Sequence, residues 1–396
     1  MIFGCANPTI GYVPSGFSSQ EHHYAASLSD PDNIRILSVS EDTLVGFHRD
    51  PIGEIADRSG VPPDTVIERL RALLGAGVIR RVRQTLLTHN LAEGALVAWR
   101  IPEESLDTAF GMMSEEDPFT GHVVIRRAEM PGPGTDYRLW TTVKVPRGYS
   151  PEKHCDFLSA RTRAESYRMM PALGVFVLGV GHIRRQALPP GTRTDKPARA
   201  MRPEQAELSH LEWNVLFALK REFAPKEIVR DIWAPRASAA GLSRDEFCSV
   251  AESLAGRKLL GRFSTFLEHS KPTGGDVQAN RHSALVQWAV PQGQELAAGG
   301  EIGRHNVLTH CYWREAGPEF GNLNIMGVIH GLEKTKVLAH KAAIDDHLRE
   351  CGFPISYSAV LWSVRAEIKP SEIEPAAYEA WCRNVNVEPS AMAVSD

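Results

Sequence analysis

An internal repeat constrains the fold of this chain more than any other feature of its sequence. GALVAWRIP at 94–102 returns as SALVQWAVP at 283–291, which aligns Trp99 with Trp288. Just upstream, AGVIRRVRQTLLTH at 76–89 returns as RKLLGRFSTFLEH at 257–269. Because self-similarity over long segments marks duplicated structural units, we predict one two-domain protein that has been duplicated and fused.

Each half begins with a helix-turn-helix pattern. In the first half, Ile52, Ile55 and Ala56 form one apolar stripe, and Gly60 ends that helix in a turn. A second amphipathic helix and an alternating strand follow within 62–87. This order predicts a winged helix-turn-helix, and the second half repeats it.

A mixed pattern of strands and helices follows each wing. In the first half the expected elements are strand 94–102, helix 103–115, strand 121–129, strand 137–145, helix 151–164 and strand 174–183. The order βαββαβ is that of a ferredoxin-like domain, so the fold class is α+β. We expect the two halves to pack as an intramolecular pseudo-dimer.

The chain is accordingly divided into seven segments. They are an irregular arm (1–31), winged helix-turn-helix 1 (32–93), ferredoxin-like domain 1 (94–185), a Pro- and Gly-rich linker (186–206), winged helix-turn-helix 2 (207–270), ferredoxin-like domain 2 (283–370) and a tail with a short helix (371–396).

Composition excludes some classes of function. The net charge is −4 and hydrophobic residues make up 43% of the chain, so no global basic field attracts the protein to nucleic acid or membranes. No apolar run approaches the ~18–20 residues of a membrane span, and the N-terminus lacks the features of a signal peptide. The six cysteines are scattered without a CxxC pair, which predicts reduced thiols and a cytoplasmic protein.

The segment 306–331 is the best candidate for a functional site. Alternation along its first strand places His310, Tyr312 and Arg314 on one face, opposite Cys311. In the second strand, His330 shares a face with Met326 and Val328. Two imidazoles, a phenol and a guanidinium are therefore expected to face one ligand.

Finer motifs add a resemblance to known proteins. A winged helix followed by a ferredoxin-like domain resembles the leucine-responsive regulator superfamily. GVIRRV, LTHCYWRE, the NL before a strand ending in HG, and VLWSVRAEIK together resemble the siroheme decarboxylases, over about 32–370. That family works in haem and haem d1 formation as paired or fused subunits.

The resemblance implies removal of acetate carboxylates from a siroheme-type tetrapyrrole. His310 is then the expected proton donor or an axial ligand to the tetrapyrrole iron, and His330 is the second candidate. Tyr312 is an auxiliary donor, while Arg314 and Arg365 clamp carboxylates. In the first half, Arg138 and Arg127 belong to a cationic cluster, completed by Arg126 and Lys144, that is expected to bind carboxylates across the pseudo-dimer interface.

The same resemblance implies few other partners. No cofactor is expected beyond the iron of the siroheme or haem ligand. A homodimer or a related partner subunit remains open, and DNA binding is not expected.

Two departures from the family pattern bear on this interpretation. The family's Trp-Pro-Tyr before Asn-Leu is here Glu319, Phe320 and Gly321. Alignment of the repeats places Val124 opposite His310, which predicts that the first half has lost its strand histidine and that one of two sites is degenerate.

Two alternative functions use the same elements. A haem carrier without catalysis would keep the same pocket. A ligand-sensing transcription regulator of the leucine-responsive type would present Arg80, Arg81 and Arg83 of the first wing to the DNA backbone. The helices that would read the bases carry mixed or acidic charge, which favours the enzyme over the regulator.

Overall fold

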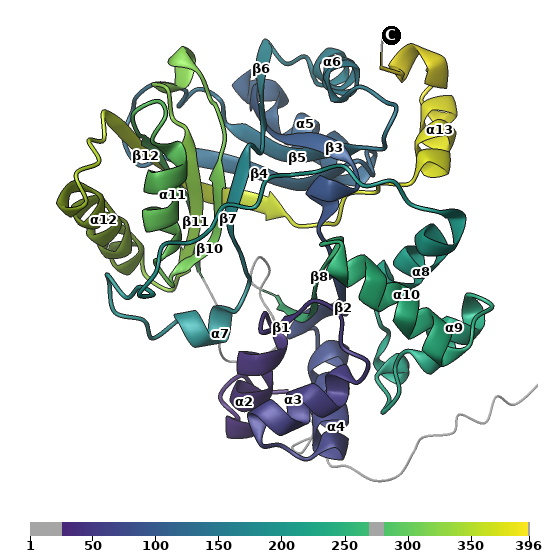
Figure 1. Ribbon diagram of the computed structural model, residues 1–396. Coiled ribbons are helices and arrows are strands. Elements are labelled where there is room, and N and C mark those ends of the chain that lie inside the picture. The colour runs from purple at the N-terminus through teal and green to yellow at the C-terminus, as the bar shows by residue number, and fades with distance from the viewer. Residues whose placement is uncertain (1–25, 269–280, 395–396) are drawn as a thin grey trace, which may run out of the picture.

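The structure is a computed structural model that describes residues 26–268 and 281–394. A body of strands covered by helices lies above a pair of helix-turn-helix units (Figure 1). This arrangement confirms the α+β class and the tandem duplication. Within the described part of the chain, no helix is both long and apolar enough to span a bilayer.

The helix-turn-helix units have closely related element orders. The first contains α2 (Pro31–Ser40), β1 (Leu44–Val45), α3 (Pro51–Ser59), α4 (Pro63–Gly75) and the wing strand β2 (Ile79–Leu86). The second contains α8 (His210–Lys220), α9 (Ala234–Ala239), α10 (Arg244–Gly256) and the wing strand β8 (Leu260–Leu267).

Local capping explains where these helices begin and end. The Asp50 side chain accepts a hydrogen bond from the Gly53 amide at the start of α3, and Gly60 ends the helix in the left-handed conformation, with φ +68°. Ser209 and Ser243 each begin a helix, α8 and α10, with a reciprocal capping box.

The two wings hold the helix-turn-helix units together. Strand β8 lies between β1 and β2 and pairs antiparallel with both, so one three-stranded sheet contains strands from both halves of the chain. Apolar side chains of both units share one core, which includes Leu70, Trp233 and Phe263. The two units therefore form a single body.

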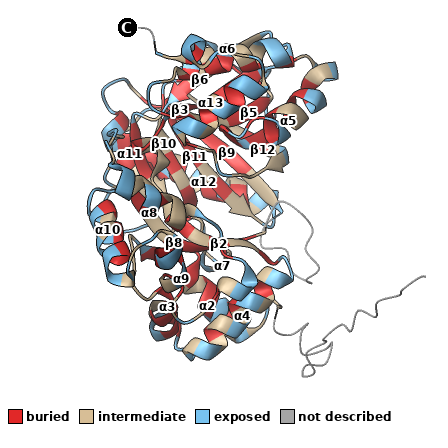
Figure 2. Cartoon of the chain, turned by 90° about the vertical axis from the view of Figure 1, so that its right-hand side faces the viewer, coloured by how far each residue is buried: buried red, intermediate tan, exposed pale blue. Residues whose placement is uncertain are grey.

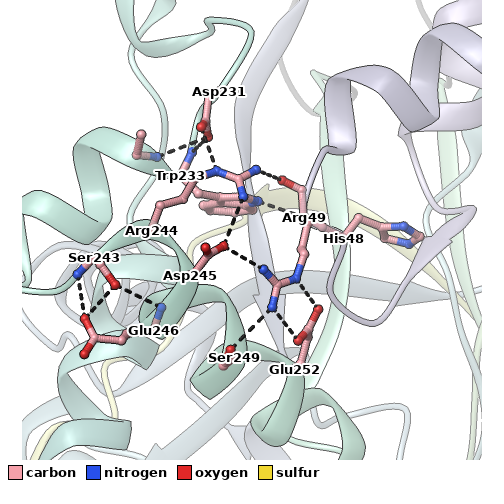
Figure 3. Close-up of polar contacts among 11 residues, drawn as sticks. His48, Arg49, Asp231, Trp233, Ser243, Arg244, Asp245, Glu246, Ser249 and Glu252 are labelled. Carbon is pink, nitrogen blue, oxygen red and sulfur yellow. Dashed lines mark hydrogen bonds and ion pairs between the residues drawn. The ribbon is translucent and has the colours of Figure 1, made fainter.

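A polar clamp reinforces this joint (Figure 3). The Arg49 guanidinium, from the loop before α3, donates to Glu252 (2.6 Å), Asp245 (3.1 Å) and Ser249 (3.4 Å) on α10. The Arg244 side chain donates back to the Arg49 carbonyl (3.0 Å). One face of α10 is thus acidic and held by the first unit.

The two ferredoxin-like repeats supply the upper body. The first contains β3 (Glu93–Arg100), α5 (Leu106–Glu115), β4 (Thr120–Ala128), β5 (Leu139–Val145), α6 (Pro151–Thr162) and β6 (Ser166–Pro171). The second contains β9 (His282–Ala289), α11 (Glu295–Gly303), β10 (Leu308–Trp313), β11 (Ile325–Gly331), α12 (Lys334–Glu350) and β12 (Tyr357–Glu367).

The repeats exchange strands. Among the described residues, nine strands form one continuous sheet in the order β6-β3-β5-β4-β12-β9-β11-β10-β7. The second half of β12 pairs with β4 of the first repeat, and β7 (Gly174–Leu178) pairs with β10 of the second repeat. Each repeat therefore completes the sheet of the other.

The last strand of the first repeat differs from the one predicted from the sequence. The prediction of a single strand at 174–183 is wrong, because β6 at Ser166–Pro171 is the strand that pairs with β3. The chain then crosses to the other repeat as β7 and turns into the short helix α7 (His182–Arg185). The run GVFVL at 174–178 is apolar throughout and is typical of a buried strand, so the sequence did not reveal that β6 precedes it.

The chain segments outside the repeats are also packed. Helix α13 (Pro375–Asn384) buries Tyr378 and Cys382 against the outer face of the first repeat. The short helix expected in this tail is therefore present, and Ala393 beyond it still pairs with Tyr149. The Pro-rich linker bonds along the second repeat, where Ala198 donates to the Gly300 carbonyl.

The inner faces of the two repeats share a core in the buried middle of the molecule (Figure 2). Phe320 contacts Tyr137 (ring centroids 4.7 Å apart) and Trp140 (6.0 Å), both from the other repeat. Gly134 adopts φ +71°, and a Cβ there would lie 2.2 Å from the Phe320 ring. The residue that departs from the family pattern is therefore a packing residue between the repeats.

We predict that Phe320→Ala destabilises the protein by about 3–5 kcal/mol, because it leaves a cavity between the repeats. The matched control is Val364→Ala, whose side chain is 57% exposed and whose loss should change stability by about 0.5 kcal/mol or less. Urea unfolding followed by tryptophan fluorescence measures both. Equal midpoints for the two variants would contradict the inter-repeat role of Phe320.

Candidate functional site

A cavity of about 1380 Å³ lies where the first wing meets the two repeats. Its walls come from β2, from the lower ends of β3 and β5, from β10, and from the segment 369–373 after β12. Typical small-molecule pockets enclose roughly 300–1000 Å³. This cavity therefore has room for a ligand larger than most metabolites.

Three basic side chains converge in the wall of this cavity. Lys144 of β5, Arg314 at the end of β10 and His89 after the first wing all line it. Each lies close enough to another to lower its pKa: Arg314 lowers that of Lys144, and both lower that of His89. No carboxylate within the described chain offsets any of these three shifts.

Burial and this mutual repulsion have measurable consequences. Burial, followed by the charge of Arg314, lowers the pKa of Lys144 to about 7. Burial, followed by Lys144 and Arg314, lowers the pKa of His89 to about 4, so this imidazole is neutral at pH 7. Burial lowers the pKa of Arg314 to about 10, which leaves it charged. A buried positive charge without a partner is costly, and an anionic ligand would remove that cost.

The side chains of β10 form a stacked row. The guanidinium carbon of Arg314 lies 4.6 Å from the centre of the Tyr312 ring. The Tyr312 ring in turn stacks on His310, with centroids 6.2 Å apart and planes 18° apart. Arg314 and Tyr312 line the cavity, whereas His310 lies behind them and is not among its lining residues. The expected shared face is therefore observed, but only two of its three side chains reach the cavity.

The strand register identifies a histidine that the sequence alignment missed. Trp140 of β5 pairs with the residue before Trp99, and Met326 of β11 pairs with the residue before Trp288. Because Trp99 and Trp288 are aligned, Trp140 and Met326 occupy equivalent positions. Val124 pairs with Trp140 as Tyr312 pairs with Met326.

Val124 is thus equivalent to Tyr312, and the prediction that it stands opposite His310 is wrong. Two residues back along each strand, His122 is the equivalent of His310. It lines the cavity, so the first half has retained its strand histidine.

Two further observations support this register. Both repeats carry a bulge at the same place, after Thr120 in β4 and after Leu308 in β10. Arg126 donates to the Leu361 carbonyl, as Arg314 donates to the Met170 carbonyl. The offset between the repeats changes from 189 at Trp99 and Trp288 to 188 at Val124 and Tyr312. A correct alignment therefore needs one gap between these strands, and the sequence alone does not show its size.

The repeat therefore relates two sets of residues. His122 and Lys144 of the first repeat, with Tyr312 and Arg314 of the second, line the large cavity. Lys144 and His330 are also equivalent positions of the two repeats. Lys144 pairs with Gly94 and His330 pairs with Ser283, and Gly94 and Ser283 are aligned. The related set is thus His310, His330, Val124 and Arg126.

Helix α7 occupies the region beside His330. Only a small pocket of about 10 Å³ remains there, lined in part by His182, Arg185 and His330. The His182 and His330 rings meet edge to face, with centroids 4.9 Å apart. Arg184 and Arg185 bond to Asp42 of the first helix-turn-helix unit at 2.8–2.9 Å. The structure thus contains one large cavity and one closed counterpart.

The remaining candidate arginines lie away from the cavity. Arg365 pairs with Asp107 (2.9 Å) and lies over the Phe110 ring of α5 on the outer face. Arg138 is paired with Glu103, and Arg127 is exposed on the outer face of β4. From the first-half cluster, only Lys144 reaches the cavity.

Comparison with known proteins agrees with this architecture. The family model described as an AsnC-like ligand binding domain matches twice, at residues 91–176 and 280–359. The siroheme decarboxylase NirDL subunit of Paracoccus pantotrophus is 25% identical over 306 residues, which cover 74% of this chain and 85% of that protein. Over most of its length the chain is therefore similar to the siroheme decarboxylases.

The fused form of that family shares the whole fold. A crystal structure of the siroheme decarboxylase NirDL superposes with a TM-score of 0.62 at 18% identity, covering 89% of this chain and 97% of that one. A second NirDL structure, in co-complex with an iron-uroporphyrin III analogue, gives a TM-score of 0.60 at 17% identity, covering 90% and 97%. Both structures thus share the fold in which two related units are joined in one chain.

We predict that Lys144→Met raises the thermal midpoint of the ligand-free protein. The folded pKa of about 7 lies below the unfolded value of 10.5, so between these values the unfolded state binds more protons and stability rises with pH. The destabilisation of the folded protein by Lys144 reaches its full value below pH 7. The gain in midpoint should therefore be largest at pH 6 and smaller at pH 9.5.

Scanning calorimetry at both pH values tests this. Lys226→Met, on an exposed side chain, is the control and should leave the midpoint unchanged. A destabilised Lys144→Met protein at pH 6 would show that this lysine has a carboxylate partner in solution.

Proposed function

We propose that this chain decarboxylates a siroheme-type tetrapyrrole, removing acetate carboxylates as carbon dioxide. The observation that carries the proposal is the pair of uncompensated cations, Lys144 and Arg314, in a cavity of about 1380 Å³. A macrocycle bearing several carboxylates matches the size of this cavity and supplies the anionic partners that Lys144 and Arg314 lack. The NirDL relatives carry the corresponding name.

The chemistry requires an electron sink and a proton. When the bond between the acetate methylene and its carboxylate breaks, the electron pair enters the conjugated macrocycle and carbon dioxide leaves. A proton delivered to the methylene carbon then produces a methyl group. No oxidant or reductant is consumed, so we propose that no cofactor is needed beyond the iron within the substrate.

The cavity residues divide these tasks. Arg314 holds a carboxylate, and its contact with the Tyr312 ring fixes the guanidinium plane. Lys144, with a pKa of about 7, holds a second carboxylate when it is protonated. We assign proton delivery to His122, which lines the cavity, because imidazole is the side chain best suited to transfer a proton near neutral pH.

His310 keeps its expected role as the rival proton donor or iron ligand. It would have to act from behind Tyr312, after rotation of that ring. His330 would act at the counterpart site, beside α7. Tyr312 remains an auxiliary hydrogen-bond donor at the cavity wall.

The alternative of a transcription regulator finds little support in the helix-turn-helix units. The acidic face of α10 is clamped by Arg49 (Figure 3), and a phosphate backbone would be repelled there. Arg83 of the first wing lines the cavity, and Arg81 pairs with Glu222 (3.3 Å). A tetrapyrrole carrier would use the same cavity, so only a reaction distinguishes it from the enzyme.

We expect anaerobic incubation with siroheme to yield a pigment lighter by one or two carbon dioxide units, as measured by mass spectrometry. An unchanged pigment whose absorption spectrum shifts on binding would support the carrier and overturn the enzyme. Gel filtration should then separate the oligomeric forms of the protein, and turnover should be measured for each fraction. Turnover that is confined to a dimer, or that is lost with a separated protein, would show that a homodimer or a partner subunit is required.

We further predict that His122→Ala lowers the rate of decarboxylation by about 10²–10⁴-fold, the usual contribution of a positioned acid. Pigment binding should persist, because the carboxylate contacts of Lys144 and Arg314 remain. His310→Ala is the paired variant, since it removes the equivalent imidazole from the second repeat. Loss of turnover in His310→Ala with a fully active His122→Ala protein would move the reacting site to the α7 side.

A further inference from the structure

A second cluster of potential ligands lies outside the cavity, on the outer face of the second repeat. Glu301 lies in the last turn of α11, and His347 and Cys351 lie at the end of α12. Their ligand atoms all lie within 4.8 Å of one another. His305, just after α11, places its ring 5.2 Å from that of His347.

We propose that Glu301, His305, His347 and Cys351 form a binding site for a divalent transition metal of the zinc type. The four residues form two pairs, each spaced by four positions, one at the end of each helix. Thiolate, imidazole and carboxylate together are the ligand set that zinc prefers over magnesium or calcium.

The distances are close to those of a tetrahedral site. The Cys351 Sγ lies 3.8 Å from His347 Nε2 and 3.9 Å from Glu301 Oε2, and these two atoms are 2.7 Å apart. Zinc bonds of 2.0–2.3 Å place neighbouring ligand atoms about 3.3–3.6 Å apart. Shifts of a few tenths of an ångström in these three atoms would therefore accommodate the metal. His305, whose ring lies 5.2 Å from that of His347, would have to move closer to become the fourth ligand.

A buried imidazole without a partner is the second, independent observation. His305 is 2% exposed, and its Nε2 has no hydrogen-bond partner among the described residues. Such a group is costly unless something binds it. Burial and the neighbouring His347 lower its pKa to about 4, so the nitrogen is neutral and ready to act as a ligand at pH 7.

The electrostatic surroundings favour a cation at this point. The C-terminal ends of α11 and α12 meet here, and each carries partial negative charge. Glu350 lies 4.0 Å from His347 Nδ1 and would orient that ring. Arg304 opposes the metal, since it pairs with Glu301 Oε2 at 2.8 Å. The charges of Glu301 and a Cys351 thiolate would balance the two charges of the metal.

The cysteine makes the site directly observable. Burial and the carboxylate of Glu301 raise the pKa of Cys351 above its usual value, so metal binding would release a proton. Cys351 is the exposed cysteine among those described, while Cys155, Cys248, Cys311 and Cys382 are buried. A metal there would join α11 to α12 and stabilise the cover of the second repeat.

The test is titration of the full chain, stripped with a chelator, with cobalt(II). We expect one equivalent to bind with the absorption of a tetrahedral site and a sulfur-to-cobalt charge-transfer band, and zinc to displace it. The thermal midpoint should rise with zinc concentration by mass action. Cys351→Ser should lose the band and weaken binding by more than about 100-fold.

Two control variants separate the outcomes. His210→Ala removes an exposed imidazole from α8 and should bind cobalt like the unmodified protein. Lys144→Met should also bind normally, which separates this site from the tetrapyrrole cavity. Absence of the charge-transfer band, or an unchanged band in Cys351→Ser, would overturn the proposal.

Discussion

The exchange of strands between the repeats is the constraint on which the rest of the structure depends. Strand β12 joins the strands of the two repeats into one sheet, pairing first with β9 and then with β4, while β7 pairs with β10. Neither repeat can therefore complete its sheet alone, and the inner faces are brought together with Phe320 between them. The same exchange places the end of β10 beside β6, where Arg314 bonds to the Met170 carbonyl. The cavity is thus a property of the joint between the repeats.

The joint between the repeats lowers the stability of the ligand-free protein and favours the binding of an anionic ligand. Lys144 and Arg314 come from different repeats, and folding moves both out of water without offering either a carboxylate. The protein tolerates this because the surrounding apolar layers and the wing sheet contribute stability elsewhere. A ligand rich in carboxylates then recovers the electrostatic cost on binding, since it binds the folded state only. Sites that are destabilised before the ligand arrives are common among functional sites.

The fold followed from the sequence to a large extent, and the site only in part. Repetition around Trp99 and Trp288 with helical and strand periodicities was enough to predict the duplicated α+β architecture, because these patterns are local. The face shared by Tyr312 and Arg314 followed from alternation in the same way. Lys144 belonged to the cluster that was expected to bind carboxylates across the interface, and it does line the cavity. The contribution of His122 was missed, because it depends on the bulge in β4 and on the register between the repeats. Arg365 and Arg138 were assigned to a ligand because pairing with Asp107 and Glu103 is invisible without coordinates.

Fusion of the repeats has a consequence for how such a protein can change. In a symmetric homodimer, every substitution appears at both related positions, so an improvement at one pocket is also imposed on its twin. Here Lys144 and His330 are related positions with different chemistry, as are Val124 and Tyr312. In one fused polypeptide, a substitution can therefore change one half without changing the other. The half that contains His330 can then be filled by α7, a short helix held by the ion pairs of Arg184 and Arg185 with Asp42, while the other half keeps its cavity.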